Sequence, residues 1–200
     1  VEKDKFVPAA LEAATFDGKV MGVPLAMDVV PVWYNKEVFE KYDIEPPKTW
    51  DEMMQVVETL KKNDVIPFSL ANKTKWTGAF YLMYFADRIG GEKLFQNAVN
   101  RKGAFDDPGY VEAGEYIQKL VKAQAFPEGF NGLDEDTGQS RQLFYSGKAG
   151  MYVMGSWFLN IIRDENPEME KKVAFFPFPA IPDGKGDPSN LVGGVSPVYS

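Results

Sequence analysis

Apolar residues recur at helical spacing in several separate stretches of this chain. The clearest stretch begins after Thr49, where Trp50, Met53 and Val57 fall on one face of a helix. Thr49 and Glu52, three residues later, form a capping-box pattern, so we predict a helix over residues 50–62. Helical spacing and capping signals predict further helices over residues 7–14, 36–42, 76–89, 108–123, 137–146 and 157–163.

Short runs of β-branched and aromatic residues separate these helices. Asn35 and Ser156 are the expected N-caps of the helices that follow two of these runs. In the first of the two, Trp33 and Tyr34 are neighbours in a strand and should face opposite ways, so one of them belongs to the core. The alternation of strands with helices predicts an α/β fold. The predicted strands or extended segments cover residues 20–25, 29–34, 65–70, 149–154, 173–176 and 191–199.

Composition excludes several classes of function. The formal charge of -7 and the isoelectric point near 4.8 disfavour nucleic acid as a partner, because the chain repels polyanions. The chain has no cysteine and no histidine, which removes disulfides, thiolate metal sites and the commonest general base. No run approaches the roughly 18 consecutive apolar residues that span a bilayer. Without cysteine and histidine most catalytic designs are excluded, so we do not expect an enzyme, a metal site or a cofactor.

Five sequence blocks resemble one family of receptors. They are FDGKVMGVP (16–24), VWYNKEVFEKY (32–42), IEPPKTWDE (44–52), GKAGMYVMGSW (147–157) and FPFPA (176–180). In this order they are similar to the extracellular solute-binding proteins of family 1, the maltose-binding-protein-like sugar receptors of ATP-binding-cassette importers.

The resemblance implies a fold, a domain division and a function. The fold would be one lobe of a two-lobed, type II periplasmic-binding-protein-like architecture, with a central mixed sheet flanked by helices. The chain would be a fragment covering mainly the second lobe. Residues 1–30 would be a remnant of the first lobe with the first hinge strand, residues 31–190 the second lobe, and residues 191–200 the second hinge segment.

The implied function is extracytoplasmic capture of a sugar or oligosaccharide between two lobes, for delivery to the permease subunits of the importer. The location would be the periplasm, or a lipid-anchored position on the bacterial cell surface. An isolated lobe would expose half of the cleft, and some self-association through that surface is expected.

Aromatic residues are the first candidates for ligand contact, because sugars stack their C–H faces on flat rings. Trp157 follows Gly155-Ser156 at a strand-to-helix junction, and the resemblance places a stacking tryptophan there. Trp76, in ANKTKWTG at a helix start, either joins this platform or anchors the helix end in the core. Tyr34 would extend the platform, whereas we interpret Trp50 as structural.

Asp28 is the polar candidate, because a carboxylate inside the apolar run PLAMDVVP needs hydrogen-bonding partners. It either accepts hydrogen bonds from ligand hydroxyls, as the resemblance implies, or forms a buried ion pair or a bond that locks the lobes. Gly193 and Gly194, in LVGGVS, either permit close approach of the second crossover to a ligand or serve only to bend the backbone.

Two other kinds of site compete with the sugar receptor. A receptor for cationic ligands such as polyamines would use the same fold, with acids and aromatic rings enclosing an ammonium group. A carbohydrate-active enzyme would use a pair of carboxylates, for which Asp134, Glu135 and Asp136 offer a cluster. The spacing DEDTG lacks the further ligands of a calcium loop, and we expect this cluster to be a solvated helix start.

Overall fold

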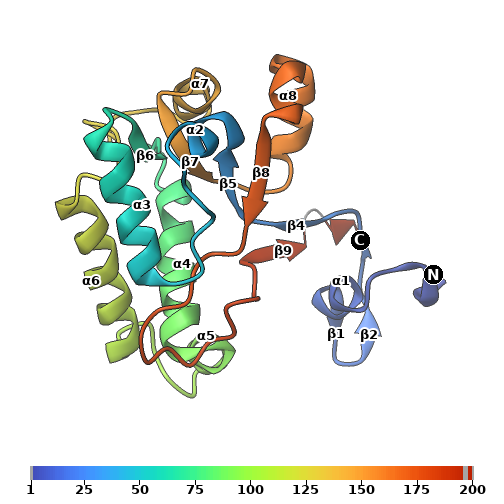
Figure 1. Ribbon diagram of the computed structural model, residues 1–200. Helices are drawn as coiled ribbons and strands as arrows, with labels where there is room; N and C mark the ends of the chain where they lie inside the picture. Colours follow the sequence, from blue (N-terminus) through green and yellow to red (C-terminus); the bar gives the residue numbers. More distant parts are fainter. Residues whose placement is uncertain (1, 196–197, 200) are drawn as a thin grey trace.

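A mixed sheet lies at the centre of the larger part of the chain (Figure 1). The computed structural model describes residues 2–195 and 198–199. Positions 196, 197 and 200 of the predicted second hinge segment, and position 1 of the predicted first-lobe remnant, lie outside the described residues. The strands are β1 (Thr15–Phe16), β2 (Lys19–Val20), β3 (Val23–Pro24), β4 (Met27–Val29), β5 (Val32–Asn35), β6 (Ile66–Ser69), β7 (Ala149–Val153), β8 (Val173–Phe176), β9 (Gly193–Val195) and β10 (Val198–Tyr199).

The central sheet has four strands in the order β6-β7-β5-β8. β6 and β7 run parallel, whereas β5 is antiparallel to both of its neighbours. The predicted α/β fold with a mixed sheet is therefore confirmed. The apolar run predicted as one or two strands before Asn35 is divided into four short strands, β2 to β5, of which only β5 belongs to this sheet.

Helices cover both faces of the sheet (Figure 1). One core cluster lies under α3, α4 and α6, and a second, which contains Trp33 and Phe158, lies under α7 and α8. The α-helices are α1 (Pro8–Ala13), α2 (Lys36–Lys41), α3 (Trp50–Lys62), α4 (Trp76–Gly90), α5 (Glu92–Val99), α6 (Pro108–Lys122), α7 (Gln139–Tyr145) and α8 (Phe158–Glu165), and the 3₁₀ helices are η1 (Lys3–Lys5) and η2 (Pro167–Lys171). Within the described residues, no helix combines the length and apolar character that crossing a bilayer requires.

Local capping signals explain where two of the helices begin. Asn35 Oδ1 accepts hydrogen bonds from the N–H groups of Glu37 and Val38, which confirms it as the N-cap of α2. Thr49 Oγ1 accepts from Glu52 N–H while the Glu52 carboxylate accepts from Thr49 N–H, so the predicted capping box of α3 is present. Both helices start at the residues that the sequence predicts.

The start of α3 also joins two of the sequence blocks that resemble the receptor family. Trp50 N–H donates to the Ala180 carbonyl at 2.7 Å, and Ala180 N–H donates to the Lys48 carbonyl at 2.9 Å. The Trp50 side chain is buried, with its ring 4.9 Å from the ring of Tyr116 and 5.7 Å from that of Phe85. Trp50 is therefore a core residue, as its structural interpretation predicts, and its ring packs against aromatic residues of α4 and α6.

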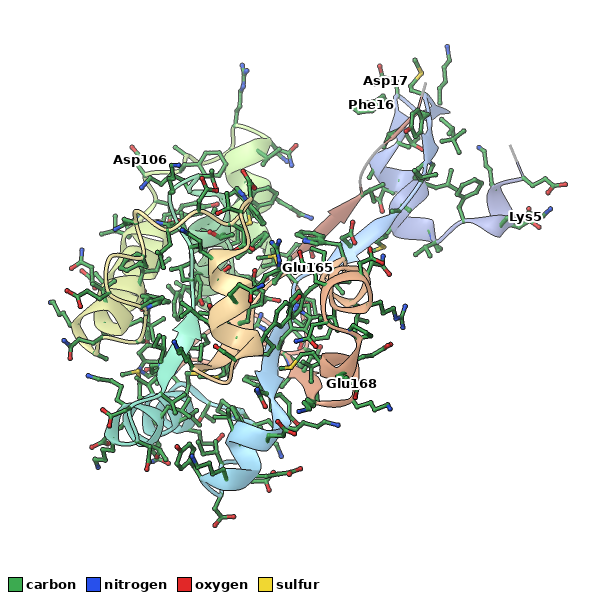
Figure 2. All side chains as sticks on the ribbon, turned by 90° about the horizontal axis from the view of Figure 1, so that it is seen from above. Lys5, Phe16, Asp17, Asp106, Glu165 and Glu168 are labelled. Carbon is green, nitrogen blue, oxygen red and sulfur yellow. The ribbon has the colours of Figure 1, made fainter. Side chains whose placement is uncertain are left out.

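Two short antiparallel pairs connect the sheet to a small N-terminal unit. β4 pairs with β9, and β3 pairs with β10, beyond which lie α1 and the β1–β2 hairpin. Seen from above in Figure 2, this unit, which carries Lys5, Phe16 and Asp17, stands apart from the helices and sheet of the larger part. This unit and the strand pairs that lead to it expose apolar side chains, among them Phe16, Leu25 and Tyr199.

Candidate functional site

Trp157 lies in the turn between the end of β7 and the start of α8. The side chain is half-buried, and its ring lies directly against the backbone of Gly155. A Cβ atom on Gly155 would come within 2.1 Å of ring carbon Cζ3 of Trp157. Glycine at this position therefore permits the observed orientation of the indole, which explains the Gly-Ser-Trp order in physical terms.

Three aromatic side chains, two from α4 and one from the turn before α8, form one surface. We call this surface the aromatic wall and define it as Trp76, Phe80 and Trp157. The rings of Trp76 and Trp157 have centroids 6.3 Å apart and planes inclined by 49°. Phe80 lies 5.6 Å from Trp76 and 6.5 Å from Trp157. All three residues are half-buried, so each packs against its neighbours and is also partly exposed to solvent.

The wall unites the two tryptophans that the sequence singled out. Phe80 was not predicted, although its position four residues after Trp76 on a helix places both on one face. Tyr34 is placed elsewhere: it lies toward the far end of β5, opposite Met151, and packs against Phe39 and Phe176. Trp33, on the other face of the strand, is buried, as the alternation of side chains predicts.

Asp28 lies on β4, the strand that precedes β5 of the central sheet. Its half-buried carboxylate accepts a hydrogen bond from Ser156 Oγ at 2.9 Å. Ser156 is also bonded to the backbone of Val29, donating through its N–H at 2.7 Å and accepting at Oγ at 3.4 Å. The prediction that Ser156 is the N-cap of a helix is therefore wrong, because its hydroxyl is turned toward β4 and α8 begins at Phe158.

The hydrogen-bond partner of Asp28 argues against a buried ion pair, one of the alternatives for this carboxylate. Among the described residues, Asp28 forms no ion pair with lysine or arginine, and its side-chain hydrogen bond is to the neutral hydroxyl of Ser156. One carboxylate oxygen, Oδ1, is engaged in this bond. Ser156 directly precedes Trp157, so the bond links the Asp28 carboxylate to the backbone segment that carries one tryptophan of the aromatic wall.

Gly193 and Gly194 lie on β9, opposite Val29 and Asp28 respectively. A Cβ atom on Gly193 would come within 2.3 Å of the Asp28 carbonyl oxygen, so backbone packing by itself requires glycine there. A Cβ atom on Gly194 would meet no atom within 4 Å. Gly194 is thus the position of the two that leaves open space beside Asp28.

A loop is hydrogen-bonded to the segment directly before Trp76, the first residue of α4. Asn72 N–H donates to the Phe130 carbonyl at 2.8 Å, and Lys73 N–H donates to the Leu133 carbonyl at 3.0 Å. Lys73 Nζ also pairs with Asp134 at 2.8 Å, and this charge lowers the pKa of the Asp134 carboxyl. The position of the aromatic wall therefore depends on the segment that contains the acidic cluster.

Within the acidic cluster Glu135 is not solvated, contrary to the sequence-based expectation, whereas Asp136 is exposed as predicted. Glu135 is only 3% exposed, and its carboxylate accepts hydrogen bonds from Tyr152 (2.6 Å), Ser140 and Arg141 (3.2 Å). Burial raises the pKa of the Glu135 carboxyl above its ordinary value, against the opposing effect of these donors. Sequence reasoning missed this network because its members come from the loop, α7 and β7, which only the fold brings together.

Glu135 gives a testable dependence of stability on pH. Because its pKa is raised in the folded state, the folded protein binds this proton more tightly than the unfolded chain does. The resulting stabilisation is fully present below the unfolded pKa, near 4.5, and is lost as the pH rises through the folded value. We expect Glu135→Gln to flatten this fall in the free energy of unfolding, measured by urea denaturation at a series of pH values above 4.5. Glu112→Gln, at an exposed site on α6, should keep the wild-type slope, and equal slopes in both variants would contradict the assignment.

Comparisons with known proteins agree on one family. The sequence profile of bacterial extracellular solute-binding proteins matches residues 1–199. The multiple sugar-binding protein of Streptococcus mutans is 30% identical, over 84% of this chain and 40% of that protein. A structure from a study of xylan utilization by the thermophilic bacterium Caldanaerobius polysaccharolyticus is 35% identical, with a TM-score of 0.89 over 96% of this chain and 49% of that one. A solved chitin oligosaccharide binding protein is 30% identical, with a TM-score of 0.84 over 96% of this chain and 47% of its own.

The relatives are considerably longer than this chain. It spans between 35% and 40% of the length of the first three curated relatives. It also matches just under half of the two solved chains. The features shared with them are therefore those of one part of a larger protein.

Proposed function

The chain belongs to the family of bacterial extracellular solute-binding proteins, and we propose that it supplies one lobe and the crossovers of an importer's receptor for an oligosaccharide. In this proposal the ligand binds between this lobe and a second one, and closure about the crossovers presents the loaded form to membrane permease subunits. The protein would act outside the cytoplasm, in the periplasm or anchored to the cell surface. The proposal assigns no chemical step to the chain.

The observation that carries this function is the aromatic wall together with the Asp28 carboxylate, which is hydrogen-bonded to the residue before Trp157. Flat rings bind the C–H faces of sugars, and a carboxylate accepts hydrogen bonds from their hydroxyl groups. Asp28 is held by Ser156, the residue before Trp157, so the two kinds of group required for sugar recognition belong to one local assembly. This pairing supports a sugar ligand, as do the names of the sugar-binding relatives.

The geometry of the wall favours a ligand with more than one sugar ring. A sugar ring inserted between two parallel indoles needs a separation of roughly 7–8 Å, about two van der Waals contacts of 3.5–4 Å each. Trp76 and Trp157 are only 6.3 Å apart and inclined by 49°, so they contact each other and leave no such slot. Each indole can offer one face, and two adjacent faces at an angle suit two consecutive rings of an oligosaccharide.

A cationic ligand fits the same groups less well. A site that encloses an ammonium group needs several acidic groups among its aromatic rings. In the described residues we find the single carboxylate of Asp28, which is linked to the aromatic wall by its hydrogen bond with Ser156. The curated relatives whose names state a ligand bind multiple sugars, maltotriose and diacetylchitobiose. We therefore retain polyamines only as an outcome of the binding test.

The division of the chain into lobes is part of the proposal. Residues 1–30 would belong to the first lobe and the first crossover, residues 31–190 to the second lobe, and residues 191–200 to the second crossover. The exposed apolar side chains of the small N-terminal unit, Phe16 and Leu25 among them, support a surface that the first lobe covers. Some self-association of the 200-residue chain follows from the same exposure.

The test is calorimetric titration, with tryptophan fluorescence, of a receptor that carries both lobes. The panel contains xylo-, malto- and chito-oligosaccharides of two to four rings, their monosaccharides, and spermidine. We expect micromolar or tighter binding of one oligosaccharide series, at least tenfold weaker binding of its monosaccharide, and a fluorescence change from the wall. The 200-residue chain alone should bind weakly because it presents half of the cleft.

Other outcomes of the titration would contradict the proposal at different levels. Binding of spermidine alone would replace the sugar by a cation. Equal affinity for a monosaccharide and its oligomers would refute the argument from the angle between the two indoles. Binding of no compound in the panel would leave family membership standing and remove the assigned ligand class.

A further inference from the structure

The hydroxyl group of Tyr84 lies between the two crossovers. Val30, directly after β4, donates its N–H to the Val192 carbonyl at 2.7 Å. In a regular antiparallel ladder Val192 N–H would return a bond to the Val30 carbonyl. In the structure Val192 N–H donates instead to the Tyr84 oxygen at 3.2 Å, and the Tyr84 hydroxyl donates to the Val30 carbonyl. One side-chain oxygen is thus inserted into the ladder between the crossovers.

The Tyr84 side chain is held firmly in this position. It is fully buried, its ring stacks on Phe178 at 4.7 Å with planes inclined by 10°, and the Arg88 guanidinium lies 5.4 Å from the ring centre. Burial raises the pKa of Tyr84 to about 12, so the hydroxyl keeps its proton near neutral pH. A fixed, protonated hydroxyl can act as a spacer of constant length.

The helix that carries Tyr84 also carries two members of the aromatic wall. Trp76, Phe80 and Tyr84 follow one another at intervals of four residues on α4, so they lie along one side of the same helix. Asp28 lies two residues before Val30. Gly194 lies two residues after Val192. Through α4, Tyr84 therefore connects the aromatic wall with β4, which carries Asp28, and with β9, which pairs with β4.

From this arrangement we propose that Tyr84 is a positioning residue for the ligand site. By spacing Val30 from Val192 it sets where Asp28 and Gly194 stand relative to Trp76 and Phe80. The residue touches no ligand itself, and its effect on binding passes through Asp28. This inference rests on the proposed function, because it concerns the same oligosaccharide site.

The first test compares Tyr84→Phe with Tyr81→Phe in the receptor that carries both lobes. Tyr81 lies on the same helix and is 1% exposed, but its hydroxyl has no hydrogen-bond partner among the described residues. Removal of the Tyr81 hydroxyl should therefore leave the affinity for the oligosaccharide unchanged. We expect Tyr84→Phe to weaken binding of the oligosaccharide about tenfold, the effect of one lost hydrogen bond to a positioned group.

A double-mutant cycle separates positioning from a general loss of stability. If Tyr84 acts through Asp28, the variant Tyr84→Phe/Asp28→Asn should bind no more weakly than Asp28→Asn alone. Additive losses, or wild-type affinity in Tyr84→Phe, would overturn the proposal. A merely structural role would weaken both backgrounds equally.

A second readout needs no ligand, so it remains informative if the oligosaccharide assignment fails. Backbone amide chemical shifts of Asp28 and Gly194 are compared by NMR in the 200-residue chain. Neither residue is hydrogen-bonded to Tyr84, so shifts in Tyr84→Phe that are absent from Tyr81→Phe would show that the strands have moved. Unchanged shifts at both residues would overturn the positioning role, whether or not the wild-type receptor binds a sugar.

Discussion

Replacement of Arg88 by methionine is expected to lower the free energy of unfolding by about 3–5 kcal/mol, the cost typical of breaking a buried charged network. The guanidinium is 1% exposed and donates to the carbonyls of Phe178 (2.7 Å), Pro188 (3.1 Å) and Asn190 (2.9 Å). It also pairs with Asp87. Methionine replaces the unbranched stem of the arginine side chain but has no guanidinium donor, so the carbonyl groups that Arg88 holds lose their partner. Urea denaturation followed by tryptophan fluorescence measures the difference.

Arg163→Met is the matched control for this prediction. Arg163 pairs with Glu170 at 2.6 Å, but its side chain is 55% exposed, and exposed ion pairs contribute at most about 1 kcal/mol. A loss of less than about 1 kcal/mol in Arg88→Met, or equal losses in both variants, would contradict the role of Arg88 as the anchor of the loop before β9.

Replacement of Trp157 by alanine is expected to weaken oligosaccharide binding by roughly 30-fold, which corresponds to about 2 kcal/mol. The change removes one indole of the aromatic wall and exposes the backbone of Gly155 against which it packs. It also leaves Trp76 without one of its aromatic neighbours. Calorimetric titration of the two-lobed receptor with the best ligand of the panel measures the loss.

Phe175→Ala provides the comparison for Trp157→Ala. Phe175 is an aromatic residue on β8 that is 61% exposed and packs against Trp33, outside the aromatic wall. Its loss should change affinity less than twofold if stacking on the wall is the source of binding energy. Retention of wild-type affinity by Trp157→Ala would remove Trp157 from the site and, with it, the main support for the sugar assignment.

Several features of the fold could be predicted from the sequence because their causes are local. The capping box at Thr49 and Glu52 and the Asn35 cap act within three residues of the chain, and both helices begin where these signals place them. The end of α4 at Gly90, followed by Gly91 with φ of 66°, likewise follows from the freedom of glycine to adopt left-handed backbone angles.

Other local features were present in the sequence but not recognised. The helix α5 was not predicted, although Leu94, Phe95 and Ala98 show helical spacing over its two turns. Its shortness, and the glycines and charged residues on either side, hide this pattern. Phe80 was overlooked in the same way, because an apolar helix gives no sign of which apolar residue faces a ligand.

For the candidate site, the sequence indicated Trp157, Trp76 and Asp28 as separate positions. It contained no information on their mutual arrangement, and it grouped Tyr34 with them, which the structure places toward the other end of β5. The bond between Asp28 and Ser156 joins residues 128 positions apart, and the bond between Val192 and Tyr84 joins residues 108 apart.

What the sequence by itself determined is most of the helices, the strands of the central sheet, the α/β class and the residue types available for binding, since capping, periodicity and composition act over a few residues. Only the tertiary structure decided that Glu135 is buried, that the Ser156 hydroxyl bonds to Asp28 and does not cap a helix, and that the Tyr84 hydroxyl lies between Val30 and Val192. These depend on the register of strands and the packing of helices distant in sequence, where many weak contacts act together and no single residue carries the signal.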